Sequence, residues 1–176
     1  QLHAGLRWIF PDLRSILAGA ISKSGPVAAK LGKPMPALIF EGANPFFGLR
    51  VNRLLSLVFG HLLNNSLDHG IELPSTRKLR RKSAQGKILV SSQMDENWVE
   101  IRWSDDGAGL DLQKLREKGR DHNLDSHDLH GQIQNMIFLP GFSTRSDSEV
   151  TEVSGRGVGL HAVLSDIRHV GGGVTA

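Results

Sequence analysis

The ten residues from His61 to Gly70, HLLNNSLDHG, close an amphipathic segment with a run of polar side chains. Apolar residues recur at helical spacing from Val51 onward, which predicts a helix from Val51 to Asp68 that Gly70 stops in a left-handed conformation. Spacings of three and four place four polar side chains on one helical face, where they can point into one pocket. The alternative is a helix whose polar residues merely face solvent. The four residues are His61, Asn65, Asp68 and His69.

Three further polar, glycine-rich motifs follow in a set order. The first of them, Asp105 to Leu110 (DDGAGL), lies where a predicted strand ends and a loop begins. A carboxylate at Asp105 can accept a hydrogen bond from the exocyclic amine of adenine, while Gly107 and Gly109 let the backbone approach the ring closely. The alternative is an ordinary Asp-Gly turn that closes a strand.

The last two motifs are Phe138 to Thr144 (FLPGFST) and Gly155 to Leu160 (GRGVGL). The glycine-rich one resembles a phosphate-binding loop at a helix start, and its spacing and late position disfavour a Rossmann fold. The polar connection over 140–155 predicts a lid, with the two phenylalanines either at its base or in the core. The residues expected to contact a nucleotide here are Phe138, Phe142, Ser143, Thr144, Gly155, Arg156, Gly157, Val158, Gly159 and Leu160.

The order of the four motifs resembles the nucleotide site of the histidine-kinase branch of the ATPase superfamily that includes gyrase, Hsp90 and MutL. Within that branch the closest likeness is to the CheA-like histidine kinases, and it covers about residues 28–173. The grouping of strands and helices predicts an α+β fold, a two-layer sandwich of a mixed β-sheet and helices. This agrees with the Bergerat-type ATP-binding fold that the resemblance implies, and by the same likeness the chain stops before the last, C-terminal strands of that fold.

The resemblance implies a role for each polar residue of the first motif. The residue matching Asn65 chelates Mg²⁺ in these kinases, and the one matching His61 lies near the transferred phosphate, which makes His61 the candidate catalytic residue. Asp68 and His69 match residues near the phosphates and the metal. Mg²⁺ favours octahedral oxygen coordination and keeps several waters, so one amide oxygen together with phosphates is sufficient to hold it.

The resemblance also assigns the second motif, because Asp105 matches the residue that selects adenine over guanine. A guanine carbonyl would face the carboxylate as a second acceptor and leave a buried group unpaired. Two positions depart from the pattern of these kinases. Asn64 stands where they usually carry Arg, and His161 stands where they usually carry Asp.

Residues 1–33 are predicted to form an N-terminal helical linker or coupling segment, and residues 34–176 the ATP-binding kinase domain. In the linker, Pro11 and Asp12 open a helix that Ser24-Gly25-Pro26 is expected to break. The other predicted elements are strands at 37–42, 87–93 and 98–104, the last two forming a hairpin, and helices at 111–118, 129–138 and 158–170.

Composition narrows the class of protein further. The chain has 176 residues, enough for one domain, and contains no apolar run of the roughly 20 residues that a membrane helix needs. The absence of cysteine excludes disulfides and thiolate metal sites and fits a cytoplasmic location, including the inner part of a membrane-attached receptor. The net charge is +3, and a basic cluster between Arg77 and Lys87 lacks interleaved aromatics, which favours a solvated basic helix over nucleic-acid binding.

The favoured function is the ATP-binding catalytic domain of a two-component sensor histidine kinase, which binds ATP and Mg²⁺ and transfers the γ-phosphate to a histidine on another domain. No histidine here lies in a recognisable phosphoacceptor motif, so that domain and a response regulator are expected elsewhere, and a homodimer through the kinase's other regions stays open. The alternative is a pseudokinase module that regulates signalling by binding proteins, for which Asn64 is the main argument. A gyrase- or MutL-like ATPase ranks third, because His61 stands where those enzymes carry a glutamate base.

Overall fold

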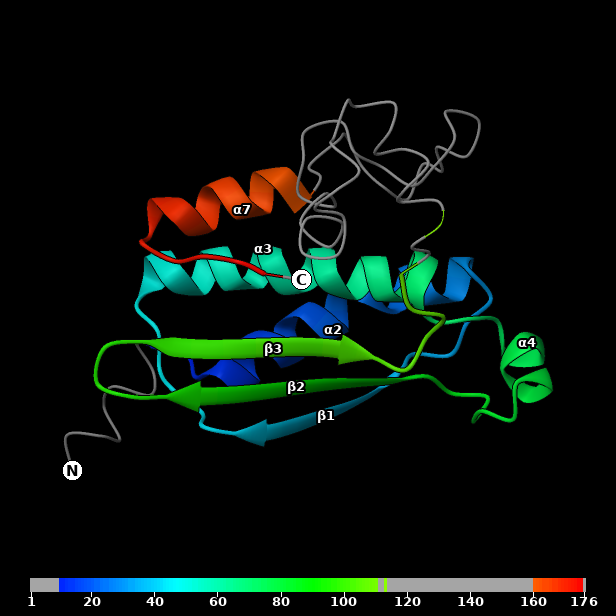
Figure 1. Ribbon diagram of the computed structural model, residues 1–176. Coiled ribbons are helices and arrows are strands. Elements are labelled where there is room, and N and C mark those ends of the chain that lie inside the picture. The colour runs from blue at the N-terminus through cyan, green and yellow to red at the C-terminus, as the bar shows by residue number, and fades with distance from the viewer. Residues whose placement is uncertain (1–9, 111–112, 114–159, 176) are drawn as a thin grey trace. The chain divides into compact units, whose positions relative to one another are not determined.

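The computed structural model describes residues 10–110, 113 and 160–175. The chain divides into two units, Gln1–Gly109 and Leu110–Ala176. The described residues of the second unit include helix α7 (Leu160–His169) and residues 170–175, which follow it. The first unit contains, in chain order, α2 (Leu13–Lys30), β1 (Ala37–Gly42), α3 (Leu49–Asn65), the π-helical turn η1 (Ser66–Gly70), α4 (Pro74–Leu79), β2 (Lys87–Met94) and β3 (Val99–Asp105), as labelled in Figure 1.

The three described strands form one mixed sheet in the order β1-β2-β3. β1 runs parallel to β2 with Ala37 opposite Lys87, and β2 runs antiparallel to β3 with Ile88 opposite Asp105. The β2–β3 turn is closed by Asp95, whose Oδ1 accepts hydrogen bonds from the amides of Asn97 (2.8 Å) and Trp98 (3.1 Å). The predicted strands and their hairpin are therefore confirmed.

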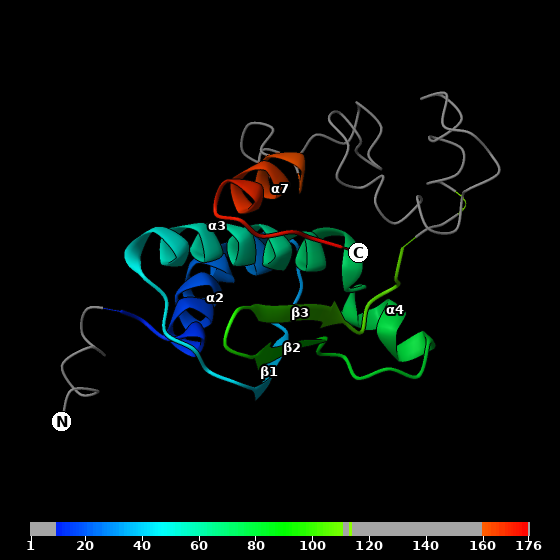
Figure 2. The same cartoon turned by 60° about the vertical axis from the view of Figure 1, so that its left-hand side comes forward.

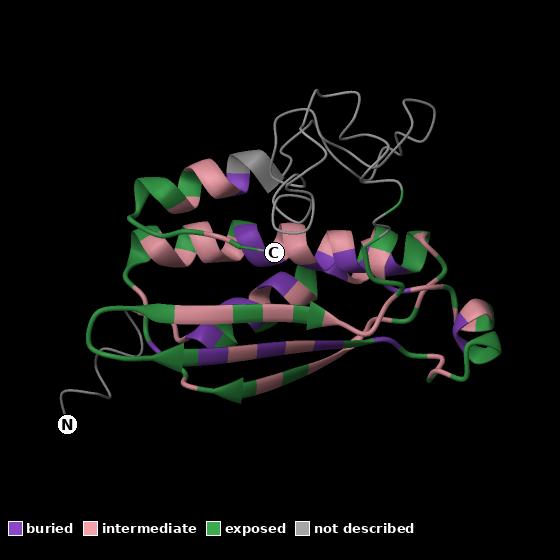
Figure 3. Ribbon diagram, viewed as in Figure 1, coloured by how far each residue is buried: buried purple, intermediate pink, exposed green. Residues whose placement is uncertain are grey.

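Helices α2 and α3 cover one face of this sheet (Figures 1 and 2), so the predicted two-layer α+β sandwich is confirmed. Alternation along β2 turns Ile88, Val90 and Ser92 inward, and the purple positions in Figure 3 follow this pattern. Phe59 of α3 stacks on Trp103 of β3 with ring centroids 6.0 Å apart. The core cluster consists of Leu13, Ile16, Leu17, Ala20, Ala28, Phe59, Leu63, Leu67, Ile71, Ile88 and Val90.

Helix α2 corrects the prediction of a break at Ser24-Gly25-Pro26, because it runs without interruption from Leu13 to Lys30. Its N-cap is Asp12, whose Oδ1 accepts from the amide of Ser15 at 2.9 Å. The buried positions of the helix form one stripe at spacings of three and four. The stabilisation from this packing outweighs the loss of the backbone hydrogen bond that Pro26 removes. Helix propensity alone does not predict this outcome. The proposed boundary at residue 33 stays a prediction, while α2 itself shares its core with α3.

Helix α7 ends in the glycines that the sequence indicates. Gly171 adopts a positive φ of 81°, and the amides of Gly171 and Gly172 donate to the carbonyls of Arg168 and Ile167, both at 3.0 Å. The helices predicted at 111–118 and 129–138 lie outside the described residues, as do the first two residues of the one predicted at 158–170. Within the described ranges, no helix combines the length and apolar character that a membrane crossing requires.

Candidate functional site

The first motif does not continue as one α-helix. Helix α3 ends at Asn65, and Ser66–Gly70 form a π-helical turn in which the amide of Ile71 donates to the carbonyl of Ser66 at 2.7 Å. His61 and Asn65 therefore keep their α-helical spacing of four, whereas Asp68 and His69 lie in the wider turn. The prediction of one α-helical face for all four is corrected to this extent. Single π-turns are rare and are frequently found at functional sites.

Gly70 is required for a reason different from the predicted left-handed stop. Its φ is not positive, unlike that of Gly109 at 76°. A Cβ built on Gly70 would lie 2.8 Å from Asp105 Oδ2, and one built on Gly107 would lie 2.1 Å from the carbonyl oxygen of Gly70. The amide of Ala108 also donates to that carbonyl at 2.8 Å. The first and second motifs therefore meet at backbone distance, and only glycine fits at the two contacting positions.

The carboxylate of Asp105 is held by two donors at the end of β3. Oδ2 accepts from the hydroxyl of Ser66 at 2.8 Å, and Oδ1 accepts from the amide of Gly107 at 3.0 Å. Ser66 is buried, and its Oγ in turn accepts from Trp103 Nε1 at 3.1 Å. A carboxylate has about four lone-pair sites, so Asp105 keeps acceptor capacity for a ligand. Sequence reasoning missed the supporting roles of Ser66 and Trp103, although Trp103 lies on the same strand face as Asp105 by alternation.

Lysine 33 ties the end of α2 to the π-helical turn. Its ammonium donates to the carbonyl oxygens of Leu67 and Asp68, the latter at 3.2 Å. Burial lowers the pKa of Lys33, and the nearby charge of Glu72 opposes that shift. Carbonyls that leave the α-helical ladder at a π-turn need other donors, and this lysine supplies one. The segment predicted as a linker therefore supports the geometry of the first motif.

Most of the basic cluster is exposed, as at Lys78, Arg80, Arg81 and Lys87, but Arg77 is completely buried. Its Nη1 donates to Glu72 Oε2 (3.0 Å) and its Nη2 to Asp106 Oδ2 (2.7 Å), the residue that follows Asp105. Lys82 Nζ donates to Glu72 Oε1 at 3.0 Å and to the carbonyl of Gly107 at 2.7 Å. A charge in the interior is tolerated when it is paired and hydrogen-bonded. The prediction of a solvated basic helix is thus corrected at Arg77, and the contacts of Arg77 and Lys82 with Glu72 and Asp106 are a part of the site that sequence reasoning missed.

The pKa values of the cluster reflect this pairing. Burial opposes the charged form of Glu72, but hydrogen bonds from its own backbone amide, Lys82 and Arg77, with the charge of Lys82, outweigh it and hold the pKa at about 2 instead of 4.5. Burial likewise opposes ionisation of Asp106, yet the amide of Lys87 and the guanidinium of Arg77 keep its pKa lowered. Both carboxylates are therefore ionised at neutral pH.

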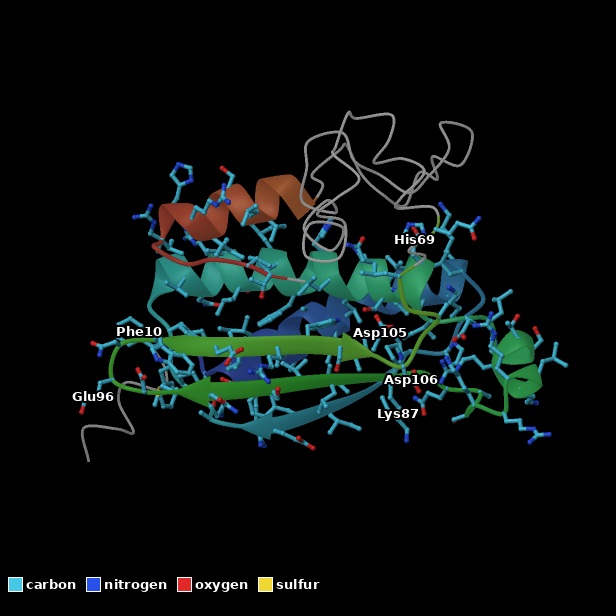
Figure 4. All side chains as sticks on the ribbon, in the orientation of Figure 1. Phe10, His69, Lys87, Glu96, Asp105 and Asp106 are labelled. Carbon is cyan, nitrogen blue, oxygen red and sulfur yellow. The ribbon has the colours of Figure 1, made fainter. Side chains whose placement is uncertain are left out.

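The ligands available for a metal are few. Among the described residues no group of three or more His, Cys, Asp or Glu side chains is placed to hold a metal ion. Asp68 Oδ2 lies 3.5 Å from His69 Nε2, and His69 is exposed in η1, the turn that follows α3 (Figure 4). Asn65, which ends α3, offers one amide oxygen, and that donor fits Mg²⁺ only where phosphates and water complete the octahedron. Burial lowers the pKa of His61, which favours its neutral imidazole.

His61 and Asn65 lie on α3, Asp68 and His69 in η1, Asp105 at the last position of β3, and Gly107 and Gly109 after it. The contacts between the two motifs run through Ser66 and Gly70 on one side and Asp105 and Gly107 on the other. Figure 4 shows Asp105 and Asp106 at the end of β3, close to Lys87 at the start of β2. Leu160 is the first residue of α7. The remaining predicted contacts, Phe138, Phe142, Ser143, Thr144, Gly155, Arg156, Gly157, Val158 and Gly159, lie outside the described residues.

Comparison with known proteins gives one family match and several relatives. The family described as "Histidine kinase-, DNA gyrase B-, and HSP90-like ATPase" matches residues 50–176. "Chemotaxis protein CheA" of Klebsiella aerogenes is 42% identical over 150 residues, 84% of this chain and 22% of that protein. "Chemotaxis protein CheA" of Bacillus subtilis is 40% identical over 120 residues, 65% of this chain and 18% of that protein. "Sensor histidine kinase CheAY" of Helicobacter pylori is 36% identical over 151 residues, 83% of this chain and 18% of that protein. The chain spans about a fifth of the length of these curated relatives.

Proposed function

Because this chain belongs to the histidine kinase-, DNA gyrase B- and HSP90-like ATPase family, with CheA-like relatives, we propose that it binds ATP with Mg²⁺ and transfers the γ-phosphate to a histidine on another domain. The observation that carries the proposal is the contact between the first two motifs. Gly70 and Gly107 meet at backbone distance, and the Asp105 carboxylate lies beside them at the end of β3.

Asp105 would read the base. Its two internal hydrogen bonds come from Ser66 and Gly107, so the carboxylate is fixed before a ligand arrives and costs little to organise. Its remaining lone pairs suit the exocyclic amine of adenine, and they repel the carbonyl that guanine carries at the same position. A site built in this way discriminates strongly, because the wrong base leaves a polar group unpaired.

Asn65 and His61 would act at the phosphates. When bound, Mg²⁺ would supply charge neutralisation during transfer. Asn65 would hold the ion through its amide oxygen, and Asp68 and His69 follow it in the π-helical turn. The lowered pKa of His61 leaves a ring nitrogen free to accept a proton or a hydrogen bond at neutral pH.

The acceptor histidine and a response regulator are proposed to lie in other parts of the whole protein, since the chain spans only about a fifth of its CheA relatives. A regulatory module without transfer activity is the second candidate. Asn64 favours it, because the site then lacks a cationic contact that an arginine would give at that position.

Calorimetric titration of the chain with ATP, ADP and GTP, with and without Mg²⁺, tests binding. We expect ATP and ADP to bind in a magnesium-dependent manner and GTP to bind far more weakly. Asp105→Asn should abolish the preference for adenine. The matched control is Asp95→Asn, which alters a carboxylate that also caps a turn, at the opposite end of the same hairpin. Equal ATP affinity in Asp105→Asn and the parent would show that the base lies elsewhere.

Transfer is tested with the whole protein or with a separate phosphoacceptor domain and labelled ATP. Label on a histidine, lost in Asn65→Ala, supports the kinase. If ATP binds but label never reaches a histidine, the regulatory function replaces the kinase.

A further inference from the structure

A completely buried arginine lies behind the contact between the first two motifs. Arg77 belongs to the short helix α4, and its side chain is 0% exposed. All three of its guanidinium nitrogens donate, Nε to the carbonyl of Ser83 (2.6 Å), Nη1 to Glu72 and to the carbonyl of Asp106 (3.2 Å), and Nη2 to the Asp106 carboxylate. Four of the five N–H groups of the guanidinium thus have a described acceptor, which is what makes a buried cation tolerable.

The two carboxylates that Arg77 joins come from the chain next to the first motif and from the second motif. Glu72 lies two residues beyond Gly70, where the first motif ends, while Asp106 is the second residue of the second motif. Lys82 reinforces the same link, because its ammonium donates to Glu72 Oε1 and to the carbonyls of Asp106 (2.8 Å) and Gly107 (2.7 Å). The loop is thus held at its side chain and at two consecutive carbonyls.

We infer that Arg77 is a positioning residue for the base-binding part of the site: by clamping Glu72 and Asp106 it fixes the Asp105–Gly107 loop in the conformation that presents the Asp105 carboxylate to adenine. The inference rests on the proposed function. The planar guanidinium is proposed to do what the ammonium of a lysine at position 77 cannot do, because two carboxylates in different directions must be held at once.

Stability alone explains the cluster poorly. Removing the side chains of Arg77 and Glu72 from water is costly, and apolar side chains of similar volume are often as good or better for stability. What an apolar replacement lacks is the directional hydrogen bonds that fix the loop. Hydrogen bonds to Asp106 from Arg77, Lys82 and the amide of Lys87 (2.8 Å) specify one loop conformation, directly next to the carboxylate that would read the base.

The test compares Arg77→Lys with Arg80→Lys. Arg80 pairs with the other oxygen of the same carboxylate, 3.1 Å from Glu72 Oε1, but its side chain is 55% exposed. For Arg77→Lys we expect the Kd for ATP to rise about tenfold and the preference for ATP over GTP to fall by a similar factor, as for the loss of one well-placed hydrogen bond. The Kd for tripolyphosphate, which has no base, should not change. Arg80→Lys should match the parent in all three measurements.

Amide hydrogen exchange adds a readout that needs no nucleotide. In Arg77→Lys the amides of Gly107 and Ala108 should exchange about tenfold faster, while those of Asn97 and Trp98 at the far end of the hairpin keep the parent's rates. A merely structural role would raise exchange at both ends through global unfolding and leave the ATP to GTP ratio of the folded fraction unchanged. That pattern overturns the inference.

If Arg77→Lys does not fold, Asp106→Asn takes its place, because it removes the same ion pair at a side chain that is 38% exposed. An unchanged ATP to GTP ratio in that variant also overturns the inference. A parent chain that binds no ATP overturns the proposed function and the inference with it. A parent that binds ATP while the variants retain its affinity and selectivity overturns the inference alone.

Discussion

Asp105→Ala should lower the free energy of unfolding even when no nucleotide is present. The substitution removes the acceptor of the buried Ser66 hydroxyl and that of the Gly107 amide. A hydrogen bond to a charged group contributes about 1.5–3 kcal/mol, and water can replace part of it because Asp105 is only half-buried, so we expect a total loss of about 2–4 kcal/mol. Asp105→Asn retains one amide oxygen as acceptor and should lose about 1 kcal/mol.

Urea unfolding followed by far-ultraviolet circular dichroism measures this difference, provided that the dependence on denaturant is the same for all variants. Asp95→Ala is the matched control, since Asp95 also accepts two amide hydrogen bonds but lies exposed in the hairpin turn, where water replaces them. Its loss should stay below about 1 kcal/mol. A double-mutant cycle between Ser66→Ala and Asp105→Ala should give a coupling energy of about 1 kcal/mol. Equal stability of Asp105→Ala and the parent, or zero coupling to Ser66, would refute the reasoning.

Three other substitutions follow from the same geometry. Asn65→Ala should weaken magnesium-dependent ATP affinity by about tenfold or more, as expected for losing a metal ligand, and leave metal-free affinity unchanged in calorimetry; an equal loss with and without Mg²⁺ would contradict the ligand role. Glu72→Gln should be less stable than the parent at neutral pH. The difference in the free energy of unfolding should disappear as the pH falls from 4.5 to about 2, because a carboxylate with a lowered folded-state pKa stabilises the fold only while it is ionised. A difference that stays constant in thermal unfolding at acid pH would be inconsistent with this. Gly70→Ala should weaken ATP binding and cost about 1–3 kcal/mol, since its Cβ would press on the Asp105 carboxylate, whereas Gly60→Ala meets no atom within 4 Å and should slightly stabilise α3.

The sequence predicted those parts of the fold that local pattern controls. Alternation along 87–93 and 98–104 matches β2 and β3, because burial of one sheet face imposes period two on each strand separately. The position of Asp105 at the end of a strand was predicted for a related reason, while its role in reading a base stays a prediction. The end of the helix near Asn65 was predicted to within a few residues, because the helical spacing of its apolar residues is also a local pattern.

Features that depend on distant partners were not predictable in this way. The continuity of α2 through Pro26 rests on packing against α3, and the π-helical turn rests on Lys33 and on the contact of Gly70 with Asp105. The burial of Arg77 was missed because its partners lie five and 29 residues away, so its surroundings in sequence look like those of a solvated basic helix. Charge patterns specify sign but not solvation.

The parallel pairing of β1 with β2 has a consequence for the order of folding. The β2–β3 hairpin closes over a short turn, whereas Ala37 pairs with Lys87 only after the intervening chain, which includes α3 and the whole first motif, has been drawn together. Loop closure of that length is slow compared with hairpin formation. We therefore expect pulsed hydrogen exchange to protect the hairpin amides first and those around Ser66 last. The proposed nucleotide pocket would then be among the last regions to form as the chain leaves a ribosome and among the first to open under stress. A bound nucleotide would therefore stabilise the most labile contacts of the domain.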